Sequence, residues 1–166
     1  AGWNDRKRDW IECTPGRGIT FKPVDLTIST CVTGIVQGVS NANNAGSGED
    51  SIFDGSWKAD IDIEKRFGDW GLAFLELEAG QGTTIADELS LFSNVNNNAN
   101  DTRSNVIVNK FFYEQYILNK QFALTVGKLD PTDYFDQNKF ADNDSIQFLG
   151  QIFNNTHAIE WPTGHG

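Results

Sequence analysis

The sequence predicts an all-β fold, an antiparallel meander of about six strands. Polar and apolar residues alternate along several runs, which is typical of strands because successive side chains of a strand point to opposite faces. Clusters of Gly, Asn and Asp separate these runs, as expected for turns and loops between strands. Hydrophobic residues make up 39% of the chain and aromatic residues 12%, so the composition is that of a folded protein.

The clearest strand signals are two neighbouring runs, 57–64 and 70–79. The first alternates apolar residues with four charged ones, Lys58, Asp60, Asp62 and Glu64. The second alternates in the same way around Glu76 and Glu78. Residues 66–69 between them are typical of a short turn. We therefore expect a hairpin with one charged face and one apolar face.

The other strands are expected on both sides of this hairpin. The run 24–37 places Leu26, Ile28 and Val32 on one face, opposite Thr27 and Ser29. Further runs are 106–118 and 121–129, joined by a tight turn at 119–120, and a final run at 145–153 or 157–161. Because residues 1–23 lack such a pattern, the chain divides into an irregular N-terminal segment, 1–23, and a strand-rich domain, 24–166.

The connections between these runs alternate between long and short. Membrane β-barrels have this alternation, with short turns on one side of the membrane and long loops on the other. No stretch approaches the roughly 18 apolar residues of a transmembrane helix, but a barrel strand needs only about 9–11 residues of alternating polarity. The sequence therefore predicts part of a transmembrane β-barrel. Since closed barrels have at least about eight strands, and lipid tolerates no open sheet edge, we expect more of the same protein or other chains to complete it.

Composition and motifs exclude several functions. The formal charge is −10, with 23 acidic and 13 basic residues, whereas nucleic-acid binding needs a basic face. The sequence has no phosphate loop, no Gly-x-Ser-x-Gly motif and no plausible Cys-His pair. We therefore predict no nucleic-acid partner, no catalytic residue and no enzymatic activity.

Two smaller features leave alternatives open. Cys13 and Cys31 form one disulfide if the protein is exported, or are two unrelated thiols. Asp130, Asp133 and Asp136 carry oxygen ligands of the kind that Ca²⁺ prefers, but their spacing does not match an EF-hand. Turn-forming Asp is the simpler explanation, so we predict no metal site.

Three segments carry a resemblance to a known family. They are residues 74–82 (FLELEAGQG), residues 112–115 (FYEQ) and residues 126–136 (VGKLDPTDYFD). Together with the later segments 147–149 (QFL) and 158–162 (AIEWP), they follow the order of the N-terminal half of the carbohydrate-selective porins of Gram-negative bacteria. The chain resembles that family over about two thirds of its length.

The resemblance implies a function. It implies a water-filled channel in the bacterial outer membrane that lets carbohydrates and ions diffuse passively into the periplasm. Such a channel has no cofactor, is surrounded by membrane lipid, and ordinarily assembles as a homotrimer. Residues on the charged faces are then expected to line the pore: Lys58, Asp60, Asp62, Glu64, Glu76, Glu78 and Glu114. Two alternatives remain, namely a secreted soluble β-sandwich that binds sugar or protein, and a structural outer-envelope barrel without an open channel.

Overall fold

The computed structural model describes residues 19–40, 51–85, 93–96, 98–99, 105–135, 140, 144 and 147–154. Within these residues the chain forms one six-stranded sheet in which strand order follows chain order and every neighbouring pair is antiparallel. The strands are β1 (Ile19–Phe21), β2 (Leu26–Ser40), β3 (Ser51–Phe67), β4 (Gly71–Gly82), β5 (Ile107–Ile117) and β6 (Phe122–Lys128). The described helical turns are η2 (Lys22–Val24), α2 (Thr132–Phe135) and α3 (Gln151–Asn154).

The longest pairing joins β2 and β3. The register between β2 and β3 is unbroken from Leu26↔Lys65 to Ser40↔Ser51. Between β3 and β4, Asp60 faces Glu78 and Asp62 faces Glu76, so the charged residues of both strands share one face, as the alternation predicts. The all-β fold and the antiparallel meander are therefore confirmed.

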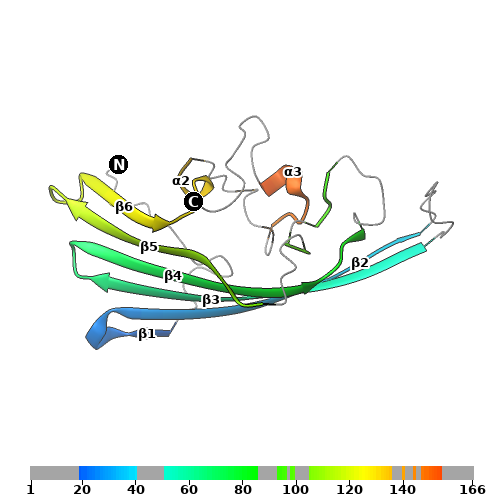
Figure 1. Ribbon diagram of the computed structural model, residues 1–166, viewed down its shortest axis with the longest axis horizontal. Helices are drawn as coiled ribbons and strands as arrows, with labels where there is room; N and C mark the ends of the chain where they lie inside the picture. The colour runs from blue at the N-terminus through cyan, green and yellow to red at the C-terminus, as the bar shows by residue number, and fades with distance from the viewer. Residues whose placement is uncertain are drawn as a thin grey trace.

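The connections differ between the two ends of the sheet. Short turns at 22–25, 68–70 and 118–121 lie together at one end, on the left in Figure 1. The β3–β4 turn contains Gly68 at φ 56°, a conformation that glycine adopts without steric penalty. The longer connections, 41–50 and 83–106, leave from the other end.

Two boundaries differ from the sequence prediction. Residues 19–21 form β1, which pairs with β2 from Ile19↔Ile28 to Phe21↔Leu26, so the strand-rich part begins earlier than residue 24. The expected last strand at 145–153 is wrong, because residues 151–154 form the helical turn α3. Its alternative position, 157–161, lies outside the described residues. The count of six strands is thus reached with β1 in place of the last run.

The sheet is not closed. Among the described residues, β1 and β6 are edge strands, each paired on one side alone. No described helix is long and apolar enough to span a membrane.

A small apolar core lies at one end of the sheet. Leu72 and Phe74 of β4 and Phe112 of β5 are fully buried, and the Phe74 and Phe112 rings are 5.3 Å apart between centroids. Leu129 and Tyr134, which follow β6, pack against these residues. This contact holds α2 against the same face of the sheet as the charged residues, because Phe74 and Glu76 have the same strand phase.

Candidate functional site

The polar face of the sheet carries all seven residues that the sequence predicts to line a pore. We define the polar face by its charged residues, each between 0 and 9% exposed: Lys58, Asp60, Asp62, Glu64, Glu76, Glu78 and Glu114. Because alternate residues of a strand point to the same face, the six charged residues of β3 and β4 lie together. The β4–β5 register adds Glu114 opposite Leu72. Charged side chains are rarely this buried without partners, so their contacts determine what the face can do.

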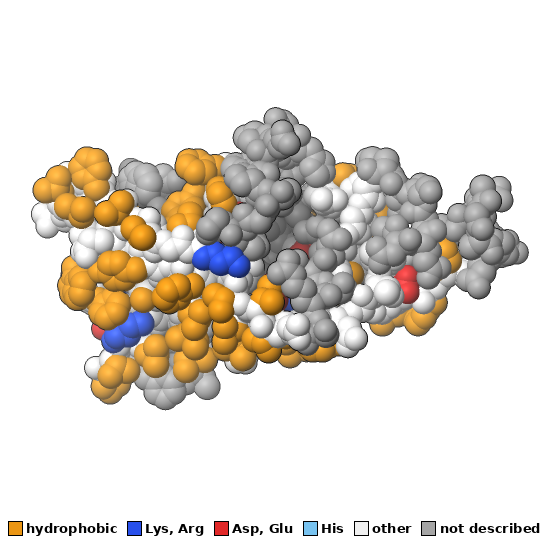
Figure 2. Space-filling view, viewed as in Figure 1, with side chains coloured by type: hydrophobic (Ala, Val, Ile, Leu, Met, Phe, Trp, Pro, Cys, Tyr) orange, Lys and Arg blue, Asp and Glu red, His pale blue; other side chains and the backbone are white. Residues whose placement is uncertain are grey.

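The opposite face, here called the apolar face, is exposed. Large apolar side chains are exposed on it along β2, β3, β5 and β6, with Val32 and Phe53 each 76% exposed. The others that are more than half exposed on these strands are Val36, Phe111, Phe122, Leu124 and Val126. Figure 2 shows hydrophobic side chains gathered along the sheet and at the end with the short turns. This distribution is the reverse of that in soluble sheets, whose apolar face is the buried one.

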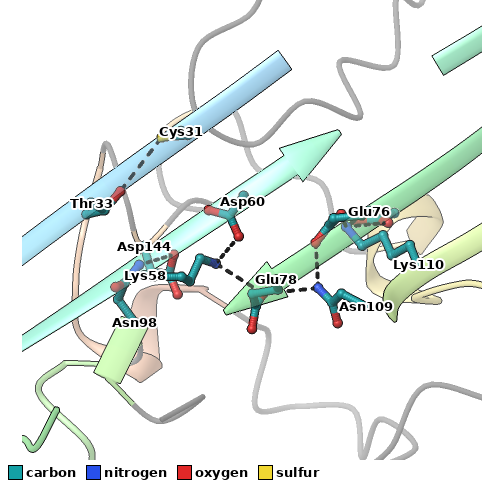
Figure 3. Close-up of polar contacts among 11 residues, drawn as sticks. Cys31, Thr33, Lys58, Asp60, Glu76, Glu78, Asn98, Asn109, Lys110 and Asp144 are labelled. Carbon is teal, nitrogen blue, oxygen red and sulfur yellow. Dashed lines mark hydrogen bonds and ion pairs between the residues drawn. The ribbon is translucent and has the colours of Figure 1, made fainter. Parts of the chain in front are cut away.

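One group of ion pairs is centred on Lys58 of β3. Its Nζ lies 3.8 Å from Asp60 Oδ1 and 3.6 Å from Glu78 Oε2 on the neighbouring strand. Figure 3 shows the ammonium group between these two carboxylates. One cation is thus shared between β3 and β4 on the polar face.

A second group is centred on Glu76 of β4, and it includes two residues that the sequence analysis missed. Asn109 Nδ2 donates to Glu76 Oε1 at 2.5 Å and to Glu78 Oε2 at 3.3 Å. Lys110 Nζ lies 3.5 Å from Glu76 Oε2. Both oxygens of the fully buried Glu76 carboxylate therefore face donors from β5.

Segments outside the sheet lie over the polar face. Asp133 of α2 pairs with Lys110 at 3.1 Å, and the Tyr134 hydroxyl lies 3.3 Å from Thr125 Oγ1 of β6. In the connection that joins β4 to β5, Asn96 Nδ2 donates to Ser56 Oγ of β3 at 3.4 Å. The backbone N–H of Gln151 in α3 donates to the Asn94 carbonyl at 2.9 Å, which links α3 to the segment that contains Asn96.

The carboxylates raise the question of a metal ion. Ligand oxygens of Asp60, Glu76 and Glu78 lie within 4.8 Å of one another, and these three are the described residues that could hold a cation together. The ammonium groups of Lys58 and Lys110 already lie among these carboxylates. Such a donor set suits a network of ion pairs and hydrogen bonds at least as well as a metal ion.

Two of the three calcium candidates of the sequence, Asp130 and Asp133, lie within the described residues. Asp130 Oδ1 accepts hydrogen bonds from the backbone N–H and the hydroxyl of Thr132, both at 2.8 Å, so it caps α2. Asp133 contacts Lys110 instead. Asp136 lies outside the described residues.

Comparison with known proteins adds no assignment. No known protein family, curated protein or solved structure matches the chain.

One of the two cysteines of the sequence, Cys31, lies beside the site. Cys31 of β2 is disulfide-bonded, and it pairs in register with Asp60 on the polar face. The other cysteine of the sequence, Cys13, lies outside the described residues.

Asn109, Lys110 and the apolar core are the features that sequence analysis missed. The signal for the first two was present: in Asn109-Lys110-Phe111-Phe112, two polar residues precede two aromatic ones, which breaks period two and indicates a bulge. Leu72, Phe74 and Phe112 share the phase of the charged residues, so alternation alone could have placed them on the polar face.

Proposed function

We propose that this chain is part of an outer-membrane β-barrel of a Gram-negative bacterium, and that the barrel is a channel for the passive diffusion of carbohydrates and ions into the periplasm. The observation that carries the proposal is the inverted distribution of polarity, with charged side chains buried on one face and large apolar side chains exposed on the other. A barrel in lipid requires this arrangement, because its outer surface contacts acyl chains and its interior contacts water.

The end-to-end asymmetry of the connections supports the same proposal. Turns at 22–25, 68–70 and 118–121 are short, and the connections from the other end are longer. Outer-membrane barrels have short turns on the periplasmic side and longer loops on the cell surface. In this proposal the Gly68 turn is therefore periplasmic.

The open edges determine what the proposal needs. Backbone groups of β1 and β6 that have no strand partner could not remain unpaired in lipid, where each such group costs several kcal/mol. The proposal therefore requires further strands beside both edges, from the same polypeptide or from other chains. A homotrimer of completed barrels is the assembly that the sequence resemblance implies.

Passage of sugars fits the chemistry of the polar face. Sugar hydroxyls must exchange water for protein hydrogen-bond partners during passage, which requires donors and acceptors along the wall. Carboxylates, amides and lysines from three adjacent strands supply both kinds of group, as at Glu76, Asn109 and Lys110. The preference for carbohydrate rests on the sequence resemblance.

One observation favours a second candidate, a structural barrel without an open channel. The charged residues of the polar face are at most 9% exposed, and segments around Asn96 and α2 lie over them. A barrel whose interior is filled in this way could anchor the envelope without conducting. The two candidates share the same fold in lipid and differ in conductance alone.

A soluble β-sandwich requires the opposite arrangement. Its sheet would bury the apolar face against a second sheet. In the described residues the apolar face has no such cover, since Val32 and Phe53 are largely exposed.

The test uses the full-length protein purified in detergent. We expect the protein to need detergent or lipid to remain monodisperse, to give stepwise conductance in planar bilayers, and to make liposomes permeable to neutral sugars. Stable inserted protein without conductance would favour the structural barrel. A monodisperse protein in plain buffer would contradict both membrane candidates.

A further inference from the structure

Strand β5 contains a bulge at the centre of the polar face. The β4–β5 register runs from Gly71↔Gln115 to Glu76↔Lys110 and then shifts to Leu77↔Val108. Asn109 is the extra residue. Consecutive strand residues normally point to opposite faces, but Asn109 and Lys110 are both buried on the polar face and both contact Glu76. Bulges re-aim side chains in this way and are frequent beside functional sites.

The bulge lets one lysine contact two different parts of the chain. Lys110 Nζ lies 3.5 Å from Glu76 on the wall and 3.1 Å from Asp133 on α2. Its side chain is 5% exposed, so water screens these ion pairs weakly. Figure 3 shows Lys110 and Asn109 on either side of the Glu76 carboxylate.

α2 is a single helical turn that depends on these contacts. A helix of this length has no stability of its own, because nucleation costs more than one turn recovers. Three described contacts fix it over the polar face. They are the Lys110–Asp133 ion pair, the hydrogen bond between the Tyr134 hydroxyl and Thr125, and the packing of Tyr134 and Leu129 on the Phe74–Phe112 core.

We propose that Lys110 is a positioning residue of the channel, which holds α2 over the polar face and thereby limits the width of the solute path beside β4 and β5. The inference rests on the proposed function, because it assigns a role within that channel. Asn109 contributes by holding the other oxygen of Glu76, which orients the carboxylate toward Lys110. Loosening the Lys110–Asp133 pair releases α2 and widens the path.

The main test variant is Asp133→Asn in the full-length protein. It weakens the pair from the α2 side and leaves Lys110 beside Glu76, so the buried carboxylate keeps its cation. Asp133→Glu retains the charge and is the conservative rescue. Asp62→Asn is the matched control, because Asp62 is a carboxylate of the same face on β3, two strands away from Lys110.

Two readouts separate anchoring from conduction. Hydrogen–deuterium exchange of the peptide that contains α2 reports release of the turn, and single-channel conductance reports the width of the path. For Asp133→Asn we expect exchange in α2 to become about tenfold faster, since a hydrogen bond to a charged group is being weakened, and the unit conductance to rise. Asp133→Glu is expected to restore both values, and Asp62→Asn to leave exchange in α2 unchanged.

The outcomes that contradict the proposal are distinct from failure of the proposed function. Unchanged exchange in α2 for Asp133→Asn overturns the anchoring role of Lys110. Faster exchange with unchanged unit conductance overturns the assignment of α2 as the element that limits the path. Absence of conductance in the native protein overturns the channel itself, and the exchange measurement then still decides whether Lys110 anchors α2.

Discussion

The two faces of the sheet differ most clearly where they belong to the same strand. On β3, Ile61 is 41% exposed, whereas its neighbour Asp62 is 4% exposed. In a water-soluble protein the order would be reversed, because transfer of a charge out of water is unfavourable and exposure of isoleucine to water is unfavourable. The contrast teaches that the polarity of this sheet is inverted relative to that of a water-soluble sheet, which is the arrangement that the proposed barrel in lipid requires.

The largest expected effect comes from comparing two adjacent phenylalanines on opposite faces. Phe112 is 1% exposed in the apolar core, and Phe111 is 58% exposed on the apolar face. We expect Phe112→Ala to lower the free energy of unfolding by about 3–5 kcal/mol, because it opens a cavity beside Phe74. Phe111→Ala is expected to lower it much less. Urea titrations of the detergent-solubilised protein measure both. Similar large losses would indicate that the apolar face is covered by protein.

Substituting lysine on each face in turn tests how well each face accepts a charged side chain. Val126 of β6 lies on the apolar face and is 64% exposed, and Thr125 beside it contacts Glu114 on the polar face at 2.9 Å. Val126→Lys is expected to destabilise the inserted protein by as much as roughly 2–4 kcal/mol, the larger value applying near the bilayer midplane. Thr125→Lys is expected to be tolerated, because the ammonium can pair with Glu114. Insertion yield into liposomes measures this difference. Equal yields would indicate that the faces are misassigned or that the protein is not in lipid.

Neutralising the polar face is expected to change transport more than stability. Asp60→Asn and Asp62→Asn each remove one negative charge from a wall that is rich in carboxylates. Acidic side chains favour cations in a channel, so both variants are expected to lower cation selectivity. Reversal potentials in a salt gradient measure the change, with Phe111→Ala as the control on the other face. An unchanged reversal potential would show that these carboxylates do not face the ion path.

The smallest effect is expected at an exposed ion pair in the turns, which contrasts with the buried pairs of the polar face. Lys120 donates a hydrogen bond to Asp69 at 2.6 Å, and this bond, with the attraction between the charges, lowers the pKa of Asp69 below its ordinary value of 3.8. The contribution of the Lys120–Asp69 pair to the stability of the fold is therefore complete above pH 3.8. It is lost as the pH falls through the lowered pKa of Asp69. Lys120→Gln should return this pKa to about its ordinary value, as measured by NMR of the carboxyl carbon. A pKa that stays low in Lys120→Gln would mean that another group is responsible.

The sequence predicted which residues of a regular strand share a face. It did not predict the features that depart from regular alternation. Alternation at Asp60, Asp62, Glu76 and Glu78 predicted that these residues share a face, because side-chain direction depends on period two alone. Pairing of the short β1 with β2 had no comparable signal, since a strand of this length shows little alternation.

The remaining parts of the site depend on contacts between distant segments. The Lys110–Asp133 pair joins β5 to a helical turn that follows β6, and no local pattern specifies such a contact. The final run at 145–153 was misjudged because a short apolar stretch fits a strand and a helical turn equally well.

The order of the strands has a consequence for how the sheet forms. Because each strand pairs with its neighbour in the chain, every pairing requires closure of one connection only. The connection 83–106 is about eight times as long as the turn 68–70, which raises the entropic cost of closing it by about 2 kcal/mol. The β3–β4 hairpin can therefore form early from local contacts, whereas the β4–β5 pairing is the slower step. The bulge that brings Lys110 to Glu76 lies in that slower pairing, so the polar face is completed after the hairpins that flank it.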